Sequence, residues 1–163
     1  MKDPIAKTIG YRLTHTARLQ KALSARLLSE LGLFPGQESV LKLLIEQDGR
    51  TMGDLANALR VRPPTASKTI ARLTTQGLVE RRTMDGDGRL VRVFLTAAGR
   101  ERGGSIDKIW DTLEGEMVAG LDGKDRKRLR KLLRKVEKNL AVRLGADGGV
   151  DEDPEGVEDD DEA

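Results

Sequence analysis

Apolar residues recur at helical spacing over most of the chain and predict a mainly α-helical protein. Residues 5–31 carry apolar side chains at nearly every turn, and a glycine and a proline then interrupt the pattern. A second predicted helix covers residues 36–47, where valine, leucine and isoleucine supply a broad apolar face. Thr51 and Asp54 have the spacing of a capping box, so we expect a short third helix to begin there.

A fourth helix is predicted to begin at two prolines and to end before a glycine. Pro63 and Pro64 would occupy its first turn, where the missing backbone N–H has no helical partner in any case. Gly77 follows the last turn, at the position where helices commonly end in the left-handed conformation. Three apolar residues recur on one side of this helix and form its predicted inner face: Ala66, Ile70 and Leu73.

Two short strands are predicted after the fourth helix, over residues 78–82 and 89–95. In the second strand two valines and a leucine alternate with an arginine and a phenylalanine, the pattern of a half-buried hairpin. The aspartates and glycines of residues 85–88 supply the turn between the strands. This order of helices and hairpin predicts a winged helix-turn-helix over residues 35–96.

Long helices are predicted on both sides of this middle region. Thr96 caps a fifth helix that runs to about residue 118, and Asp122 caps a sixth with an apolar stripe opposite a dense basic face. A first helix of about 27 residues would extend about 40 Å, which is more than a small domain needs. Its apolar stripe must be covered, so we predict a symmetric dimer in which residues 1–34 and 97–146 are the dimerisation helices.

The charge of the chain is divided unevenly. The formal net charge is +2, yet residues 147–163 contain ten acidic residues and no basic one. Residues 1–146 therefore carry 29 basic and 17 acidic side chains, a net charge of +12. A body this basic favours a polyanionic partner. The acidic segment has too few apolar residues to form a core and is predicted to be a disordered tail.

The composition excludes several classes of protein. The chain has no cysteine, which excludes disulfides, thiolate metal sites and thiol redox chemistry. Its single histidine, His15, has no second ligand of its kind for a metal. The sequence contains no phosphate-binding loop and no nucleophile with its base, so we predict neither an enzyme nor a cofactor or metal site. The lack of a long apolar run or signal peptide favours the cytoplasm and no membrane contact.

The fourth helix carries side chains suited to reading DNA. In a helix-turn-helix the second helix enters the major groove and contacts base edges from its N-terminal part. Thr65, Lys68 and Arg72 lie at i, i+3 and i+7, so they share one face, opposite the apolar inner face. Hydroxyl and methyl groups suit base edges, and cations suit guanine or phosphate. The predicted DNA contacts from this helix are Arg62, Thr65, Ser67, Lys68 and Arg72.

The hairpin supplies two further candidates. Arg89 lies at the base of the aspartate–glycine turn and is a candidate for the minor groove or a phosphate. Asp87, two residues earlier, is placed to orient its guanidinium by a charge-assisted hydrogen bond. Arg82 on the first strand faces either a phosphate or solvent alone.

Several short motifs between residues 39 and 99 occur together. They are Pro64-Thr65-Ala66-Ser67-Lys68, Arg72-Leu73, Gly77-Leu78-Val79, Arg82, Asp87-Gly88-Arg89 and Leu95-Thr96-Ala97-Ala98-Gly99. This stretch resembles the MarR family of bacterial transcriptional regulators. The order of helices outside it also fits, so the resemblance covers about residues 5–144. The glycine-rich hairpin tip, the Gly103-Gly104 pair and the acidic tail depart from the family pattern.

The resemblance implies a homodimer that binds a pseudo-palindromic operator and is usually released from DNA by a small effector. In such dimers an effector site is expected between the dimerisation helices and the winged domain. The candidates by position are Tyr11, His15, Arg18, Phe34 and Trp110. Each also has a structural interpretation; Trp110, for example, falls among apolar residues and suits a core or a subunit interface.

Two other functions would use the same features. A winged-helix module can bind protein instead of DNA, because a fold does not fix a function; the surface around Lys68 and Arg72, however, offers no apolar anchor. A DNA-packaging protein without sequence preference would also use the basic body. The favoured prediction is a sequence-specific transcriptional regulator, most often a repressor. Residues 147–163 either solubilise it or compete with DNA for the basic body.

Overall fold

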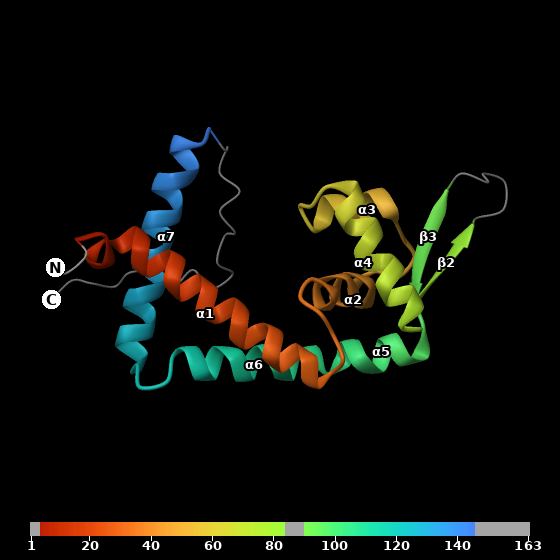
Figure 1. The fold of residues 1–163 in the computed structure, drawn as a ribbon, viewed down its shortest axis with the longest axis horizontal. Coiled ribbons are helices and arrows are strands. Elements are labelled where there is room, and N and C mark those ends of the chain that lie inside the picture. Colours follow the sequence, from red (N-terminus) through yellow and green to blue (C-terminus); the bar gives the residue numbers. More distant parts are fainter. Residues whose placement is uncertain (1–3, 84–89, 146–163) are drawn as a thin grey trace, which may run out of the picture. The chain divides into compact units, whose positions relative to one another are not determined.

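The computed structural model describes residues 4–83 and 90–145, which are drawn in colour in Figure 1. The chain divides into two compact units, Met1–Met117 and Val118–Ala163, which we describe separately. The elements of the first unit are η1 (Pro4–Lys7, a 3₁₀ turn), α1 (Ile9–Glu30), α2 (Gln37–Glu46), β1 (Arg50–Thr51), α3 (Met52–Ala58), α4 (Pro63–Thr75), β2 (Val79–Thr83), β3 (Val91–Leu95), α5 (Ala97–Gly104) and α6 (Ile106–Met117). The second unit contains α7 (Gly123–Arg143). The predicted mainly helical fold with a small antiparallel sheet is confirmed.

One apolar core holds the first unit together. It joins residues from α2, α3, α4, β2, β3 and α6, and α1 reaches it through Leu27 and Leu28 near its C-terminal end. The predicted inner face of α4 is confirmed, because Ala66, Ile70 and Leu73 are all buried. Helix α1 also packs against α6, and apolar side chains near the N-terminus of α1, such as Ile9, are exposed.

The sheet has three antiparallel strands in the order β1-β3-β2. In the β2–β3 hairpin Val79 pairs with Leu95, and the pairing runs outward to Thr83 and Val91. Strand β1 is not predicted by the sequence, because two residues are too short to show an alternating pattern. The turn before β1 is tied to β3, since the Asp48 carboxylate accepts a hydrogen bond of 2.9 Å from the Leu95 backbone N–H.

The predicted unbroken helix from Thr96 to about residue 118 was wrong, because the structure interrupts it at Ser105. Two adjacent glycines precede the break, and glycine weakens a helix interior by about 1 kcal/mol relative to alanine. Gly103 is also needed for packing. A β-carbon there would lie 2.5 Å from the Ile45 side chain, so the glycine lets α5 approach α2 closely.

The predicted helix caps are confirmed. Thr51 and Asp54 form a reciprocal capping box at the start of α3. Thr96 caps α5 by accepting a hydrogen bond of 3.0 Å from the Gly99 N–H, and Asp122 caps α7. Gly77 ends α4 with a positive φ of 71°, as its position predicts.

Asp54 is expected to make the stability of the fold depend on pH. The pKa of its carboxyl is lowered from 3.8, chiefly by the side-chain hydrogen bond of Thr51 and then by the Thr51 backbone. A lowered pKa stabilises the folded state above the unfolded pKa, and this contribution is lost as the pH falls through the folded pKa. The free energy of unfolding of the native chain should therefore exceed that of Asp54→Asn at neutral pH. Denaturant titrations at several pH values should show this difference shrinking below about pH 4. A difference that does not change with pH would contradict the expectation.

In the second unit α7 forms over its whole length without burying any side chain in a single chain. Leu132 and Leu140 on its apolar stripe are 50% and 57% exposed. An amphipathic helix with this much exposed apolar surface needs a partner surface to cover it. Among the helices of the described residues, none is long and apolar enough to cross a membrane.

Candidate nucleic-acid interface

Helix α4 turns its apolar side to the core and its polar side to solvent. Thr65, Lys68 and Arg72 are exposed on one face, as their spacing predicts, while Ser67 is half-buried. Arg62 is exposed at the N-cap, where it makes no side-chain capping bond. These five side chains therefore belong to one helix and its first turn, the part of a helix-turn-helix that meets base edges.

The two prolines at the start of α4 decide which groups can contact DNA. Helix N-termini often bind phosphate through free backbone N–H groups. Pro63 and Pro64 have no N–H, and the next two amides, Thr65 and Ala66, donate to the Arg62 carbonyl oxygen at 2.9 and 3.2 Å. No free amide is left in this first turn, so side chains must make the contacts.

Arg82 is held on the hairpin by two neighbours. Its guanidinium forms an ion pair with Glu80 on the same strand and lies 4.7 Å from the centroid of the Phe94 ring. Glu80 and Phe94 are paired residues of β2 and β3, so the three side chains share one face of the hairpin. The Glu80 carboxylate would therefore compete with a DNA phosphate for the Arg82 guanidinium. Arg89 and the turn residues 85–88 lie outside the described residues.

A hydrogen-bonded pair of glutamines, one buried and one exposed, connects the end of α4 to the segment between α1 and α2. Gln37 is 1% exposed, and its amide nitrogen donates to the Gln76 side-chain oxygen at 2.8 Å. Gln76 in turn donates to the Gly32 carbonyl oxygen at 3.0 Å, and Gln37 accepts from the Phe34 N–H at 2.9 Å. Sequence reasoning missed this network, because glutamines 39 residues apart show no pattern along the chain.

A shallow groove of about 500 Å³ runs beside the exposed face of α4. Phe34, which is 58% exposed, lines the groove together with Lys68, Ala71, Arg72, Thr75 and Gln76. The groove therefore places an aromatic ring beside the two cations predicted to contact DNA, so the expectation that this surface offers no apolar anchor was wrong. The structure assigns Phe34 to this surface and not to the neighbourhood of Trp110.

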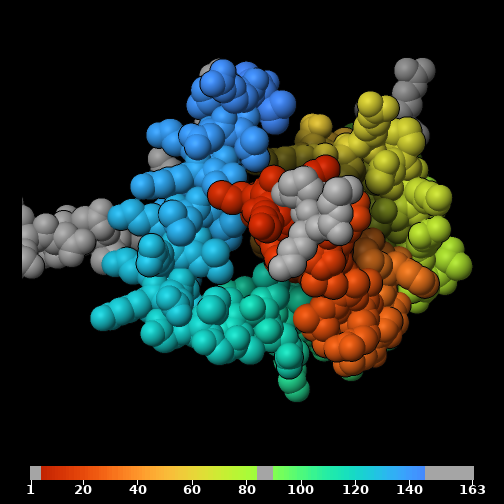
Figure 2. Space-filling model, turned by 60° about the vertical axis from the view of Figure 1, so that its left-hand side comes forward, coloured from red at the N-terminus to blue at the C-terminus, as the bar shows by residue number. Residues whose placement is uncertain are grey.

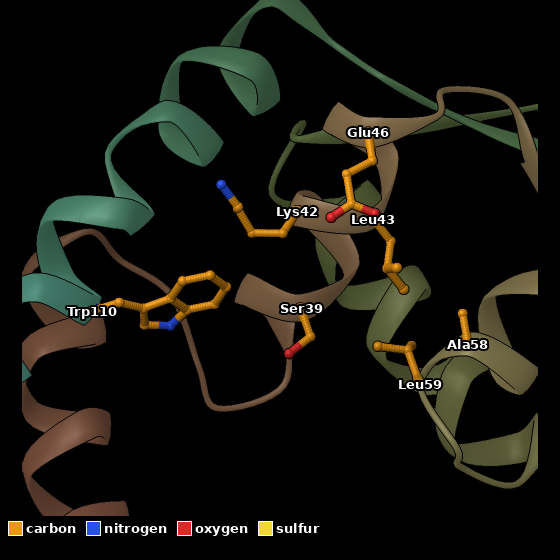
Figure 3. A pocket seen from close by; sticks show the side chains of 7 residues that line it. All are labelled: Ser39, Lys42, Leu43, Glu46, Ala58, Leu59 and Trp110. Atoms are coloured by element: carbon orange, nitrogen blue, oxygen red, sulfur yellow. The ribbon is translucent and has the colours of Figure 1, made fainter. Parts of the chain in front are cut away.

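A second pocket of about 300 Å³ lies between α2, α3 and α6 (Figure 3). Figure 3 shows the indole of Trp110 facing across the pocket toward Leu43, Leu59 and Ala58. The Lys42 ammonium lies 5.5 Å from the centroid of the Trp110 ring and 2.6 Å from an Asp107 carboxylate oxygen. The site thus combines an aromatic ring, aliphatic walls and a cation at its rim.

The structure separates the five effector candidates. Tyr11 and His15 stack on each other on α1, with ring centroids 5.9 Å apart, and both are exposed. Arg18 is exposed on the same helix, and Phe34 lies beside α4. Of the five, Trp110 alone lines the pocket of Figure 3. It is 41% exposed, so it is not a core residue of this chain.

The described residues contain no group of three or more histidine, cysteine, aspartate or glutamate side chains that could hold a metal ion.

The three-helix motif, the exposed cations of α4 and the attached hairpin define a winged helix-turn-helix protein. The sequence model of the MarR family matches residues 23–90. In sequence over these residues and in fold, the chain is similar to MarR-family transcriptional regulators, which are DNA-binding proteins.

Relatives of the chain agree with this assignment. It is 25% identical over 122 residues to the uncharacterized HTH-type transcriptional regulator YdgJ of Bacillus subtilis strain 168, covering 75% of this chain and 74% of that protein. A probable transcriptional regulator from Pseudomonas aeruginosa has a similar structure, with 26% identity, a TM-score of 0.69 and coverage of 81% and 98%. The MepR–DNA complex of S. aureus matches with 25% identity, a TM-score of 0.70 and the same coverage.

Proposed function

We propose that the protein is a homodimeric repressor that binds a pseudo-palindromic operator through α4 and is released by a small molecule. The observation that carries the proposal is the division of α4, whose cations and hydroxyls face solvent while its apolar residues are buried. The similar structure of MepR in complex with DNA supports a DNA target for this surface. Because the target is DNA, the proposed place of action is the cytoplasm.

The proposed dimer rests on apolar surface that a single chain leaves exposed. In α1 Ile9 and Leu19 are 71% and 59% exposed, and α7 buries none of its leucines. Exposed apolar stripes of this kind mark interaction sites. We propose that residues 1–34 and 97–146 pair with the same segments of a second copy, leaving residues 35–96 to bind DNA.

Selection of DNA by the purified protein tests this function. In a symmetric dimer the two α4 helices should enter successive major grooves about 34–36 Å apart. Sequencing of fragments selected from random duplexes should therefore give an inverted repeat whose half-sites are about one helical turn apart. Recovery of unrelated fragments, with equal affinity for scrambled DNA, would indicate a packaging protein instead.

The pocket lined by Trp110 is the proposed effector site. Its lining combines the flat indole and the aliphatic residues Leu43 and Leu59 with the carboxylate of Glu46 and the ammonium of Lys42, for which a ligand anion would compete with Asp107. Such a lining suits a small planar apolar molecule with one negatively charged group. The pocket lies between α6, a proposed dimerisation helix, and α2 and α3 of the winged domain, so a bound molecule can alter the contact between them.

Trp110→Ala is expected to raise the ligand concentration needed for half-release of DNA about tenfold, because an aromatic contact is lost. The measurement is operator release by a panel of small aromatic acids, with their uncharged amides as controls. Trp110→Phe should keep most of the response. Trp110 is the one tryptophan of the chain, so active acids should also change the protein's fluorescence. Equal sensitivity of the native chain and Trp110→Ala would place the effector elsewhere.

A further inference from the structure

Helix α7 carries a continuous basic face that neither the proposed dimer nor the proposed DNA-reading surface uses. Six of its basic side chains, all exposed, lie within an arc of about 100° around the helix, counted at about 3.6 residues per turn. They are Lys124, Lys127, Arg128, Lys131, Lys135 and Lys138. Figure 2 shows long side chains of this cyan-to-blue segment projecting outward from the helix.

The helix itself does not neutralise this basic face. Its two acidic residues, Asp125 and Glu137, lie more than about 90° from the centre of the basic arc by the same helical geometry. Leu129, Leu133 and Leu140 lie on the opposite side, and Leu132 lies at the edge between the two faces. Like charges spaced four residues apart, such as Lys127 and Lys131, destabilise a helix. A polyanion lying along the basic face would therefore stabilise α7.

The chain supplies such a polyanion directly after the helix. Residues 147–163 carry ten acidic side chains and no basic one, whereas α7 carries ten basic and two acidic ones. The basic face spans about 21 Å from Lys124 to Lys138 at 1.5 Å per residue. A segment of 17 residues can extend to about 56 Å, so it is long enough to turn back along the whole face.

We propose that residues 147–163 bind the basic face of α7 in the same chain and shield it from nucleic acid. The net charges of the two segments, +8 and −10, nearly cancel. Opposite charges held in one chain meet at a high effective concentration, so this contact forms ahead of non-specific DNA. The result is a lower affinity for DNA of arbitrary sequence. The proposal does not rest on operator recognition.

A spin label tests the contact without any DNA. Because the native chain has no cysteine, Val157→Cys gives a single site for a nitroxide. At low salt the label should broaden the amide NMR signals of α7, and 1 M salt, where the Debye length is about 3 Å, should abolish the effect. No broadening in α7, or broadening mainly in α4, overturns the proposal. The proposal is also overturned if the broadening of α7 disappears when chains that carry both the nitroxide and ¹⁵N are diluted with unlabelled chains, because the contact is then between molecules.

A pair of variants tests the shielding. Replacing all ten acidic residues of 147–163 with their amides should tighten binding to a mixed-sequence duplex at low salt about tenfold or more. Adding Lys124→Gln, Lys131→Gln, Lys135→Gln and Lys138→Gln should remove that gain. Circular dichroism of each variant checks that α7 remains helical. A gain that survives the lysine substitutions means that the acidic segment shields another surface, which overturns the proposal.

Discussion

Replacing Lys68 and Arg72 together with alanine is expected to lower the operator affinity at least about 30-fold, since a side chain that reads a base contributes about 1–3 kcal/mol. Both side chains are exposed on the same face of α4, and neither packs into the core, so their loss should leave the fold intact. The measurement is the dissociation constant from fluorescence anisotropy at one fixed salt concentration, for the operator and for a scrambled duplex. Loss confined to the operator identifies base contacts, and equal loss on both identifies phosphate contacts.

A double variant with the same change of charge provides the control. Arg12 and Lys108 are exposed on α1 and α6, outside the winged domain. Arg12→Ala with Lys108→Ala removes two positive charges without changing α4; once sedimentation shows the same oligomeric state as the native chain, it should weaken DNA binding only slightly through the overall field. If both double variants lost the same affinity for the operator, the general charge of the protein would explain binding and α4 would have no special role.

Gly99→Ala is expected to destabilise the winged domain by about 3 kcal/mol or more, a large effect for one methyl group. A β-carbon at this position would lie 1.8 Å from the backbone oxygen of Leu78. That oxygen also accepts a hydrogen bond of 3.1 Å from the Thr96 N–H, so the backbone cannot easily move away. The junction of β2 and α5 would have to separate, and the hairpin would lose its attachment to the helices.

The neighbouring glycine pair contains a matched control. A β-carbon on Gly104 would meet nothing within 4 Å, and Gly104 lies in the same short helix, α5. Gly104→Ala should therefore be neutral or stabilise the protein by up to about 1 kcal/mol, because alanine favours the helix. Urea unfolding of the two variants beside the native chain measures both effects. Equal stability of the two variants would contradict the importance of the close approach at Gly99.

Features that depend on neighbouring residues could be predicted from the sequence. The caps at Thr51, Thr96 and Asp122 and the end of α4 at Gly77 each depend on a side chain or backbone angle within a few residues. The buried and exposed faces of α4 follow from helical spacing alone.

Features that depend on distant contacts could not be predicted. The close approach of Gly103 to Ile45 joins α5 to α2, which are far apart along the chain, and β1 exists only because it pairs with β3. The same holds for the candidate sites. The sequence does not show that Arg82 has an aromatic neighbour. Phe94, which pairs with Glu80 across the hairpin, lies against its guanidinium. Trp110 fitted an apolar pattern, yet it lines a pocket.

The Gln37–Gln76 hydrogen bond determines how salt titrations of this protein should be interpreted. Both groups are uncharged amides, and one is buried, so neither salt nor pH in the physiological range changes the support they give to α4. The contacts of α4 with DNA, in contrast, weaken steeply with salt because counterions are released on binding. Once the salt-sensitive contact proposed for residues 147–163 is allowed for, the slope of affinity against salt therefore reflects the phosphate contacts, with no concurrent loss of this support for α4.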